Sequence, residues 1–204
     1  MGDYAQDPVV RMEGITKRFG TITALSNVDF TVERHEVVGL LGDNGAGKST
    51  LIKVLTGVHT PTSGQIYFEG KPVEIRSPRD ARALGIETCY QDLALVPLMS
   101  ITRNFYLGRE LMTGIGPLQW LNVREMDRQA REALKDIGIH IRSPNEKVGR
   151  RSGGERQSIA IGRARFFGAK LLILDEPTSA LSVGETRKVI NYTLNAKERG
   201  LSVI

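Results

Sequence analysis

The sequence contains little cysteine, few aromatic residues and no long apolar run. Of its 204 residues one is Cys and one is Trp, and Phe, Trp and Tyr together make up 6%. A single Cys excludes a disulfide framework and a multi-cysteine zinc site, so we expect Cys89 to be a buried strand residue in a reducing cytoplasm. No apolar stretch approaches the roughly 20 residues of a membrane-spanning helix, and no secretory signal pattern is visible. We expect that the chain does not itself enter a bilayer.

The excess of positive charge is mild. Lys and Arg number 28 and Asp and Glu number 23, which gives a net charge of +5. This balance suits an anionic ligand such as phosphate, but it is too small to require nucleic acid. The 22 Gly exceed what a helical bundle usually needs, so we expect glycine-rich loops to matter. The length allows one domain of ordinary size or two small ones.

The first 91 residues alternate between patterns typical of strands and of helices. Alternating and wholly apolar runs predict strands, while capping residues, Pro and Gly mark helix ends. The predicted strands are 9–15, 28–32, 37–41, 64–70 and 86–90, and the predicted helices are 48–55, closed by Gly57, and one that follows Ser77-Pro78. This order predicts a mixed α/β fold.

The pattern changes between residues 97 and 168, where strand patterns disappear. The segment MTGIGPLQW predicts a turn, and a charged amphipathic helix is predicted from Asn122, with Glu125 completing a capping box. We expect a helical insert here. After it, 171–174 predicts a wholly apolar strand, 183–198 a helix and 201–204 the beginning of a further strand.

The strongest motif is GDNGAGKST, which follows an apolar run and opens a helix. Its glycines let successive N–H groups converge on a phosphate beside the positive end of a helix. Lys48 can reach the β- and γ-phosphates, and the Ser49 hydroxyl can ligate Mg²⁺. The expected nucleotide-binding residues of this loop are Gly42, Asp43, Asn44, Gly45, Ala46, Gly47, Lys48, Ser49 and Thr50. A glycine-rich turn that binds nothing is the alternative.

Two acidic residues, Asp175 and Glu176, follow the apolar strand 171–174. Open parallel α/β sheets place their ligand chemistry at the carboxyl ends of strands. Asp175 suits a water-mediated contact with Mg²⁺, and Glu176 suits polarising the attacking water. Taken alone, an adjacent acidic pair in a turn is usually just solvated, but a phosphate loop in the same chain favours the catalytic interpretation.

A second candidate anion site is RSGGERQ, residues 151–157, which predicts the start of a helix. Ser152 is a natural N-cap, and Glu155 is placed to complete a capping box. Capping does not explain Gly153 and Gly154, which weaken a first helical turn but expose its N–H groups to an anion. Capping alone and phosphate binding both remain open for this segment.

Together these segments resemble the ATPase cassette of ABC proteins, in order and over nearly the whole chain. GDNGAGKST is similar to the phosphate loop, Gln91 to the Q-loop, RSGGERQ to the signature, LILDEP to the second nucleotide motif and SALS at 179–182 to the D-loop. The resemblance implies an α/β fold, a P-loop NTPase of the ABC type with a mixed sheet core and a helical subdomain. It implies one domain over 1–204, with 1–96 and 169–204 as the nucleotide-binding core and 97–168 as the helical subdomain.

The resemblance also implies roles for individual residues. Phe19 would stack on adenine, with a core Phe as the alternative. Gln91 would touch Mg²⁺ and the attacking water. The implied catalytic residues are Glu176, Gln91 and Lys48, the implied Mg²⁺ contacts are Ser49, Gln91 and Asp175, and the further implied ATP contacts are Ser152, Gly153, Gly154, Glu155 and Ser179.

In the family's mechanism, two subunits form a head-to-tail dimer that sandwiches two ATP molecules. Each ATP lies between the phosphate loop of one subunit and the signature of the other, so binding would close the dimer and hydrolysis would open it. The resemblance implies transmembrane permease subunits as partners, a periplasmic sugar-binding protein as an indirect partner, and no nucleic acid. It implies a peripheral position at the cytoplasmic face of the inner or plasma membrane.

The motifs depart from the family pattern in the signature and the D-loop. The signature begins with Arg151 where Leu is usual and has Glu155 where Gln is usual, and the D-loop ends in Ser182 where Asp is common. Glu155 places negative charge near a phosphate site, although its carboxylate can turn back toward the Ser152 N–H. We expect activity to be tuned down rather than lost.

A further departure concerns the family's switch His, which follows the strand that ends here at Ile204. His35, His59 and His140 all precede that position. We therefore expect a C-terminally truncated cassette in which ATP binding survives better than turnover.

The stretches QDLALVPLMSITRNFYLGRE and SGGERQSIAI are similar to carbohydrate-import cassettes, especially single-cassette importers of the fructose-uptake type. The expected function is ATP binding and hydrolysis that power a sugar importer. The alternatives are a nucleotide-binding regulatory module without turnover, an ABC ATPase acting on nucleic acid, and an NTPase outside the ABC family.

Overall fold

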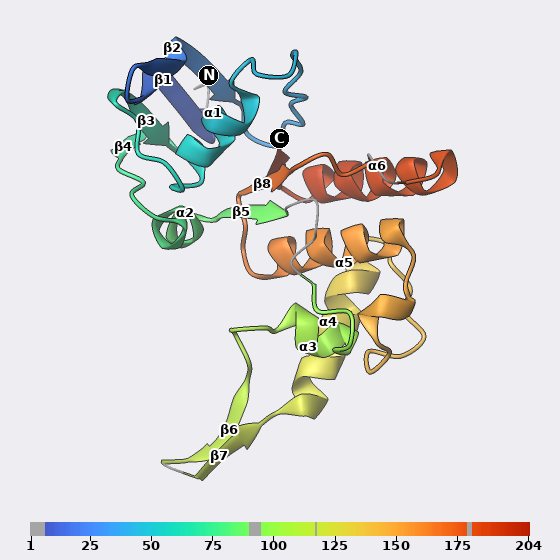
Figure 1. Cartoon of the computed structure of the whole chain (residues 1–204). Helices are drawn as coiled ribbons and strands as arrows, with labels where there is room; N and C mark the ends of the chain where they lie inside the picture. Colours follow the sequence, from blue (N-terminus) through green and yellow to red (C-terminus); the bar gives the residue numbers. More distant parts are fainter. Residues whose placement is uncertain (1–6, 90–94, 117, 179–180) are drawn as a thin grey trace, which may run out of the picture. The chain divides into compact units, whose positions relative to one another are not determined.

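The computed structural model describes residues 7–89, 95–116, 118–178 and 181–204 (Figure 1). The chain divides into two compact units. Unit 1 comprises Met1–Thr88, Gly168–Leu174 and Lys197–Ile204, and unit 2 comprises Cys89–Phe167 and Asp175–Ala196. Most of the strands belong to unit 1 and most of the helices to unit 2.

An antiparallel sheet of four strands forms one part of unit 1. Its strands are β1 (Val10–Phe19), β2 (Ile22–Val32), β3 (Ser63–Phe68) and β4 (Lys71–Val73), in the order β2-β1-β3-β4. The side chains of Val10, Met12 and Ile15 in β1 are fully buried. A register shift between Met12 and Ile15, at Gly14 with φ of +60°, returns Ile15 to the buried face of the strand.

A second sheet, which belongs to unit 1 except for Cys89, contains β5 (Ile86–Cys89), β8 (Leu171–Leu174) and β9 (Ser202–Val203), in the order β5-β8-β9. β8 pairs with β9 in parallel. Leu171 and Ile173 of β8 belong to the same buried core as β1, which explains why this strand is wholly apolar. Cys89 is buried, as predicted from its strand context.

The two helices of unit 1 begin and end where the sequence marks them. α1 spans Lys48–Leu55, as predicted. α2 spans Pro78–Leu84, and the Ser77 hydroxyl oxygen accepts the Asp80 N–H at 3.3 Å. Pro78 fits the first turn because its missing N–H is not needed there, and Gly85, with φ of +93°, ends the helix in the left-handed conformation.

Residues 37–41 do not form the strand that their apolar run predicts. Val37 makes an isolated bridge with Val203, and the Val38 N–H donates to the Val203 carbonyl at 2.8 Å. β9 contains only two residues, and one of them, Val203, forms the single bridge to this segment. Leu41 is 90% exposed. An apolar run becomes a strand only where a partner strand satisfies its N–H and C=O groups.

Unit 2 is built around α4 (Val123–Asp136) and α5 (Gly153–Phe166), which pack against each other (Figure 1). The close approach occurs at Gly162, where a Cβ would lie 2.8 Å from the Leu134 side chain and 3.1 Å from that of Ile137. The remaining helices are α3 (Ile101–Phe105), the 3-10 helix η1 (Val148–Arg150) and α6 (Val183–Glu198). Among the residues that the structure describes, no helix is long and apolar enough to cross a membrane.

The segment MTGIGPLQW, predicted as a turn, contains most of a β-hairpin. Its strands are β6 (Met112–Ile115) and β7 (Leu118–Leu121), and Thr113 pairs with Trp120. The prediction was incomplete because this hairpin makes its own strand pairs locally, and Gly114 and Gly116, both with positive φ, allow the tight backbone.

The amino-terminus of α4 matches the prediction in part. The Asn122 side-chain oxygen accepts the Glu125 N–H at 3.2 Å, so the predicted N-cap is confirmed. The Glu125 carboxylate does not complete a capping box but accepts hydrogen bonds from Arg128 and Gln129. Arg128 and Gln129 lie one turn further along the helix, within reach of the Glu125 carboxylate, and bind it in place of the Asn122 N–H.

Candidate nucleotide-binding site

The candidate phosphate loop leads into α1 in unit 1. Gly42, Gly45 and Gly47 have φ values of +154°, +85° and +90°, which glycine adopts without the strain that a side chain would cause. At Gly47 a Cβ would lie 2.8 Å from the Ala24 carbonyl oxygen and 2.9 Å from the Leu25 side chain. Only glycine therefore fits directly before the first residue of α1.

Lys48, the first residue of α1, bends back over this loop. Its Nζ donates to the carbonyl oxygens of Gly42 at 2.6 Å and Asp43 at 2.8 Å. The N-cap Gly47 provides no side-chain cap, and the first turn of α1 contains no acidic residue. Uncapped N–H groups at the positive end of a helix, next to an ammonium group, form a combination that binds phosphate.

Phe19, at the end of β1, presents an aromatic face to solvent. It is 42% exposed, which does not fit the alternative of a core Phe. The His59 ring meets it edge-on with the ring centroids 5.1 Å apart, and the Lys17 Nζ lies 5.1 Å from its centroid. An exposed, electron-rich ring held by two neighbours is suited to stacking against a planar base.

The acidic pair Asp175 and Glu176 directly follows β8, and both residues are exposed. The Asp175 N–H donates to the Cys89 carbonyl at 3.1 Å, which holds the backbone at this point. Glu176 has φ of +46°, a left-handed conformation that costs a residue with a side chain about 1–2 kcal/mol. Strain of this kind is commonly retained at functional sites, where a side chain must keep a set direction.

α5 begins with a complete capping box at its amino-terminus. The Ser152 hydroxyl oxygen accepts the Glu155 N–H at 3.3 Å, and the Glu155 carboxylate accepts the Ser152 N–H at 3.0 Å. The predicted capping roles of Ser152 and Glu155 are confirmed. Gly153 also has a packing reason, because a Cβ there would lie 2.5 Å from the Leu181 side chain.

Arg151, which precedes this cap, neutralises two carboxylates. Its side chain is 11% exposed and pairs with Glu146 at 2.6 Å and with Glu155 at 2.9 Å. Burial alone would raise the pKa of Glu155, but the Ser152 N–H and the Arg151 guanidinium hold that pKa below its ordinary value. Glu155 is therefore ionised at neutral pH, and Arg151 offsets its charge.

A further carboxylate, that of Glu185 in the first turn of α6, lies at the same helix end. A Cβ at Gly154 would lie 3.2 Å from the Glu185 Cβ, so the two helix starts touch. The pKa of Glu185 is lowered, first by the Ser182 N–H and then by the Ser152 hydroxyl, the Ser182 hydroxyl and the Gly154 N–H. Two of these groups, the Ser152 hydroxyl and the Gly154 N–H, are ones that we expected to meet a phosphate.

Sequence reasoning missed Glu185. The spacing of Ser182 and Glu185 is that of a capping box, and the Glu185 carboxylate accepts the Ser182 N–H at 3.2 Å and the Ser182 hydroxyl at 3.0 Å. That signal places Glu185 in the first turn of a helix, but its contact with Gly154 depends on how α6 packs on α5.

The predicted site residues are divided between the two units. Phe19 and residues 42–50 belong to unit 1, while residues 152–155, Asp175 and Glu176 belong to unit 2. Within unit 2, the structure brings residues 152–155 together with the start of α6. Gln91 and Ser179 lie outside the described residues.

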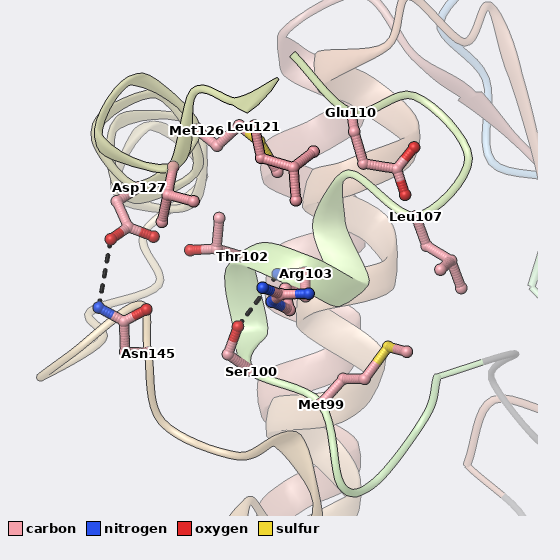
Figure 2. Close-up of a pocket in the computed structure, with 11 residues that line it drawn as sticks. Met99, Ser100, Thr102, Arg103, Leu107, Glu110, Leu121, Met126, Asp127 and Asn145 are labelled. Atoms are coloured by element: carbon pink, nitrogen blue, oxygen red, sulfur yellow. Dashed lines mark hydrogen bonds between the residues drawn. The ribbon is translucent and has the colours of Figure 1, made fainter. Parts of the chain in front are cut away.

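A separate small pocket, of about 80 Å³, lies in unit 2 (Figure 2). Asp127 and Asn145 lie at one side of it, where Asn145 donates to one carboxylate oxygen of Asp127 at 3.2 Å. The other oxygen, Oδ1, is buried and has no hydrogen-bond partner among the described residues. Leu107 and Glu110, the ends of the LGRE stretch that is similar to carbohydrate-import cassettes, also line the pocket.

Comparison with known proteins gives consistent matches over nearly the whole chain. A family model described as "ABC transporter" matches residues 25–179. The chain is 45% identical to the fructose import ATP-binding protein FrcA of Rhizobium meliloti, over 98% of this chain and 78% of that protein. It is 47% identical to the xylose/arabinose import ATP-binding protein XylG of Sulfolobus acidocaldarius, over 96% of this chain and 76% of that protein.

The fold is similar to that of solved ATP-binding cassettes. The ADP conformation of MJ1267, an ATP-binding cassette of an ABC transporter, superimposes with a TM-score of 0.82 at 29% identity, over 96% of this chain and 79% of that one. The predicted fold class, a P-loop α/β cassette with a mixed sheet core and helices, is thereby confirmed.

Proposed function

Because this chain belongs to the ABC transporter family of ATP-binding cassettes, we propose that it binds and hydrolyses ATP to power a sugar importer. The observation that carries the proposal is the loop before α1, where Gly47 fits only as glycine and the Lys48 ammonium lies over the turn. Sugar as the cargo is supported by the fructose and xylose/arabinose importers to which the chain is similar.

The nucleotide contacts that we propose begin in unit 1. The N–H groups of 42–50 surround the phosphates, Lys48 meets the β- and γ-phosphates, and Phe19 stacks on the base. Ser49 through its hydroxyl, Gln91 through its amide oxygen and Asp175 through a water would hold Mg²⁺, because this ion prefers oxygen donors. Mg²⁺ supplies neutralisation of the phosphate charge when it is bound.

The hydrolytic role falls to Glu176, with Gln91 beside the attacking water. Glu176 is exposed at the end of β8 and held in a strained conformation, which supports a side chain with a set direction. Its carboxylate accepts a proton from water as the water oxygen attacks the γ-phosphorus, the bond to the oxygen that bridges the β- and γ-phosphates breaks, and ADP and inorganic phosphate leave. The N–H groups of the phosphate loop and the Lys48 ammonium stabilise the negative charge that develops on the phosphate.

The dimer that we propose is head-to-tail. In each ATP site, residues 152–155 and Ser179 of one subunit face the γ-phosphate bound by the loop of the other. Support comes from the start of α5, where the N-cap Ser152 is exposed, Gly153 is half-buried and Gly154 is buried, and where the two glycines carry no Cβ over the N–H groups. The close contacts of Gly153 with Leu181 and of Gly154 with Glu185 are a second reason for these glycines.

A permease in the membrane is the further partner that we propose, with a periplasmic sugar-binding protein acting only through it. This places the chain at the cytoplasmic face of the membrane. The pocket of unit 2 supports a docking role because the carboxylates of Glu110 and Asp127 in its lining suit a basic side chain of such a partner.

The nucleotide proposal is tested by replacing Lys48. Lys48→Ala should weaken ATP binding, measured by titration with a fluorescent ATP analogue, by about a hundredfold, because it removes a charge-assisted contact. Lys53→Ala, in the last turn of α1, removes the same charge away from the loop and should leave the affinity unchanged. Equal affinities for Lys48→Ala and the wild type would refute the role of Lys48.

The transport proposal is tested by uptake of labelled sugar in cells that lack the gene for this chain. Fructose, xylose, arabinose and ribose are supplied in turn, and the gene is restored as wild type or as Lys48→Ala. We expect uptake of one sugar with the wild type and none with Lys48→Ala. If each of the four sugars enters cells with the wild-type gene and cells with Lys48→Ala at the same rate, the chain does not power their import. The nucleotide proposal is tested separately by ATP binding.

A further inference from the structure

The amino-terminus of α5 is already occupied by carboxylates of the same chain. Glu155 lies there as the capping-box partner of Ser152, and its charge is offset by Arg151 at 2.9 Å. Glu185 lies there through the contact of α6 with Gly154. The Glu185 carboxylate accepts hydrogen bonds from the uncharged N–H and hydroxyl groups of Ser182, and the nearby Ser152 hydroxyl and Gly154 N–H help to lower its pKa.

These contacts create a conflict with the proposed dimer. The γ-phosphate of an ATP bound by a second subunit needs donors from residues 152–154, and the first turn of α6 lies against this helix start, with the Glu185 Cβ 3.2 Å from where a Cβ on Gly154 would lie. A phosphate brought to this helix end meets a negative charge within the range of strong electrostatic interaction. When the dimer forms, the Glu185 carboxylate must move away from the start of α5. Otherwise its repulsion of the γ-phosphate weakens the dimer.

We propose that Glu185 acts as an internal anion that competes with the γ-phosphate of ATP for the Ser152 hydroxyl and the Gly154 N–H, and so weakens ATP-driven dimerisation. The inference rests on the proposed sandwich dimer. Glu185 does not contact the nucleotide in this proposal. It changes how strongly the first turn of α5 binds the γ-phosphate. ADP lacks the γ-phosphate, so the competition raises the cost of the ATP-bound dimer without changing the binding of ADP to one subunit.

The geometry allows Glu185 to give way without unfolding its helix. The same carboxylate caps α6 through Ser182 at 3.0 and 3.2 Å, so it keeps a capping partner when the α5 donors turn to a phosphate. Gln is also a capping-box residue at this position. Glu185→Gln therefore removes the charge and retains the cap.

The test measures dimer formation of the 204-residue chain by sedimentation, with Mg²⁺ and a non-hydrolysable ATP analogue. Glu185→Gln should tighten the dimer by about tenfold or more relative to wild type. Glu198→Gln, at the far end of α6, removes the same charge away from α5 and should leave the dimer constant unchanged. Glu185→Asp, which keeps the charge, should behave like wild type.

Two further readouts separate electrostatic competition from a merely structural effect. The advantage of Glu185→Gln over wild type should shrink from about 0.1 M to about 1 M NaCl, as the Debye length falls from about 10 Å to about 3 Å. The affinity for ADP, measured by titration, should be equal in wild type and Glu185→Gln.

The outcomes distinguish this inference from the proposal beneath it. If the wild type dimerises with the ATP analogue and Glu185→Gln dimerises equally or less well, the inference is overturned and the sandwich dimer stands. If every variant binds the analogue but none dimerises, the sandwich dimer fails and the inference fails with it. If Glu185→Gln dimerises more tightly than wild type by the same factor at low and high salt, the effect is not electrostatic and the proposed competition is also overturned.

Discussion

At the scale of single residues, Gly47 shows how a backbone requirement marks a site. Its φ is +90°, and a Cβ at this position would lie 2.8 Å from the Ala24 carbonyl oxygen, which leaves no room for any other residue. Lys48 then depends on Gly47, because the turn brings the Gly42 and Asp43 carbonyl oxygens within reach of its Nζ. The conformation of the phosphate loop is therefore set by the glycine backbone and the Lys48 hydrogen bonds, without a bound nucleotide.

We predict that Gly47→Ala lowers the free energy of unfolding by about 2–4 kcal/mol, since it adds left-handed strain and a clash with backbone. The measurement is urea unfolding at equilibrium. Gly108→Ala is the matched control, because Gly108 also has a left-handed φ, +75°, but open space around it. Equal losses for the two variants would show that strain alone, and not the contact with Ala24, makes Gly47 necessary.

At the scale of elements, α4 is held by one buried stripe. Met126, Ala130 and Leu134, spaced four residues apart, are buried, while the charged residues of the helix lie outside this stripe. Leu134 meets α5 at Gly162, so the small residue on one helix and the large residue on the other permit the close packing.

We predict that Leu134→Ala lowers the free energy of unfolding by about 2–5 kcal/mol, because it removes buried surface and leaves a cavity. Leu194→Ala, at a position 43% exposed on α6, should cost less than about 1 kcal/mol. Denaturant unfolding of both variants gives the comparison. A cost for Leu134→Ala as small as that of Leu194→Ala would contradict the packing of α4 on α5.

At the scale of the whole molecule, carboxylates with lowered pKa values connect stability to pH. Arg128 and Gln129 lower the pKa of Glu125 to about 2, Lys170 is the main cause that lowers the pKa of Glu69, and the pKa of Glu155 is lowered as well. A lowered carboxyl pKa contributes stability that is fully present above the ordinary value and is lost as pH falls through the folded-state value.

We therefore predict that stability declines as pH falls from just above the ordinary value of 4.5 toward about 2. Urea midpoints measured across this range give the slope. Glu125→Gln should flatten the slope, and Glu198→Gln serves as the control for losing one negative charge. A slope unchanged in Glu125→Gln would show that this carboxylate is not coupled to folding.

The catalytic cycle that we propose also belongs to the scale of the whole molecule, because it requires two subunits. For a chain extended past Ile204, we predict that Glu176→Gln keeps ATP binding and accumulates the ATP-bound dimer, with ATP turnover reduced by about a hundredfold or more. Phosphate release and sedimentation measure the two effects. Turnover equal to wild type would assign the general-base role to another residue.

The sequence alone determined the features that depend on neighbours along the chain. α1 begins at Lys48 after Gly47, α6 spans Val183–Glu198 as predicted, and Ser152 caps α5 with Glu155. Each of these follows from local rules of turn, cap and period, which act over about four residues. The order of the motifs was likewise sufficient to identify the family.

Only the tertiary structure decided which distant residues meet. Residues 37–41 do not become a strand because β9, their neighbour, is two residues long and bridges them only at Val37. Arg151 pairs with both Glu146 and Glu155, and Glu185 lies against Gly154 because the first turn of α6 approaches that of α5. Contacts of this kind depend on the packing of whole elements, whose geometry no local pattern of side chains encodes.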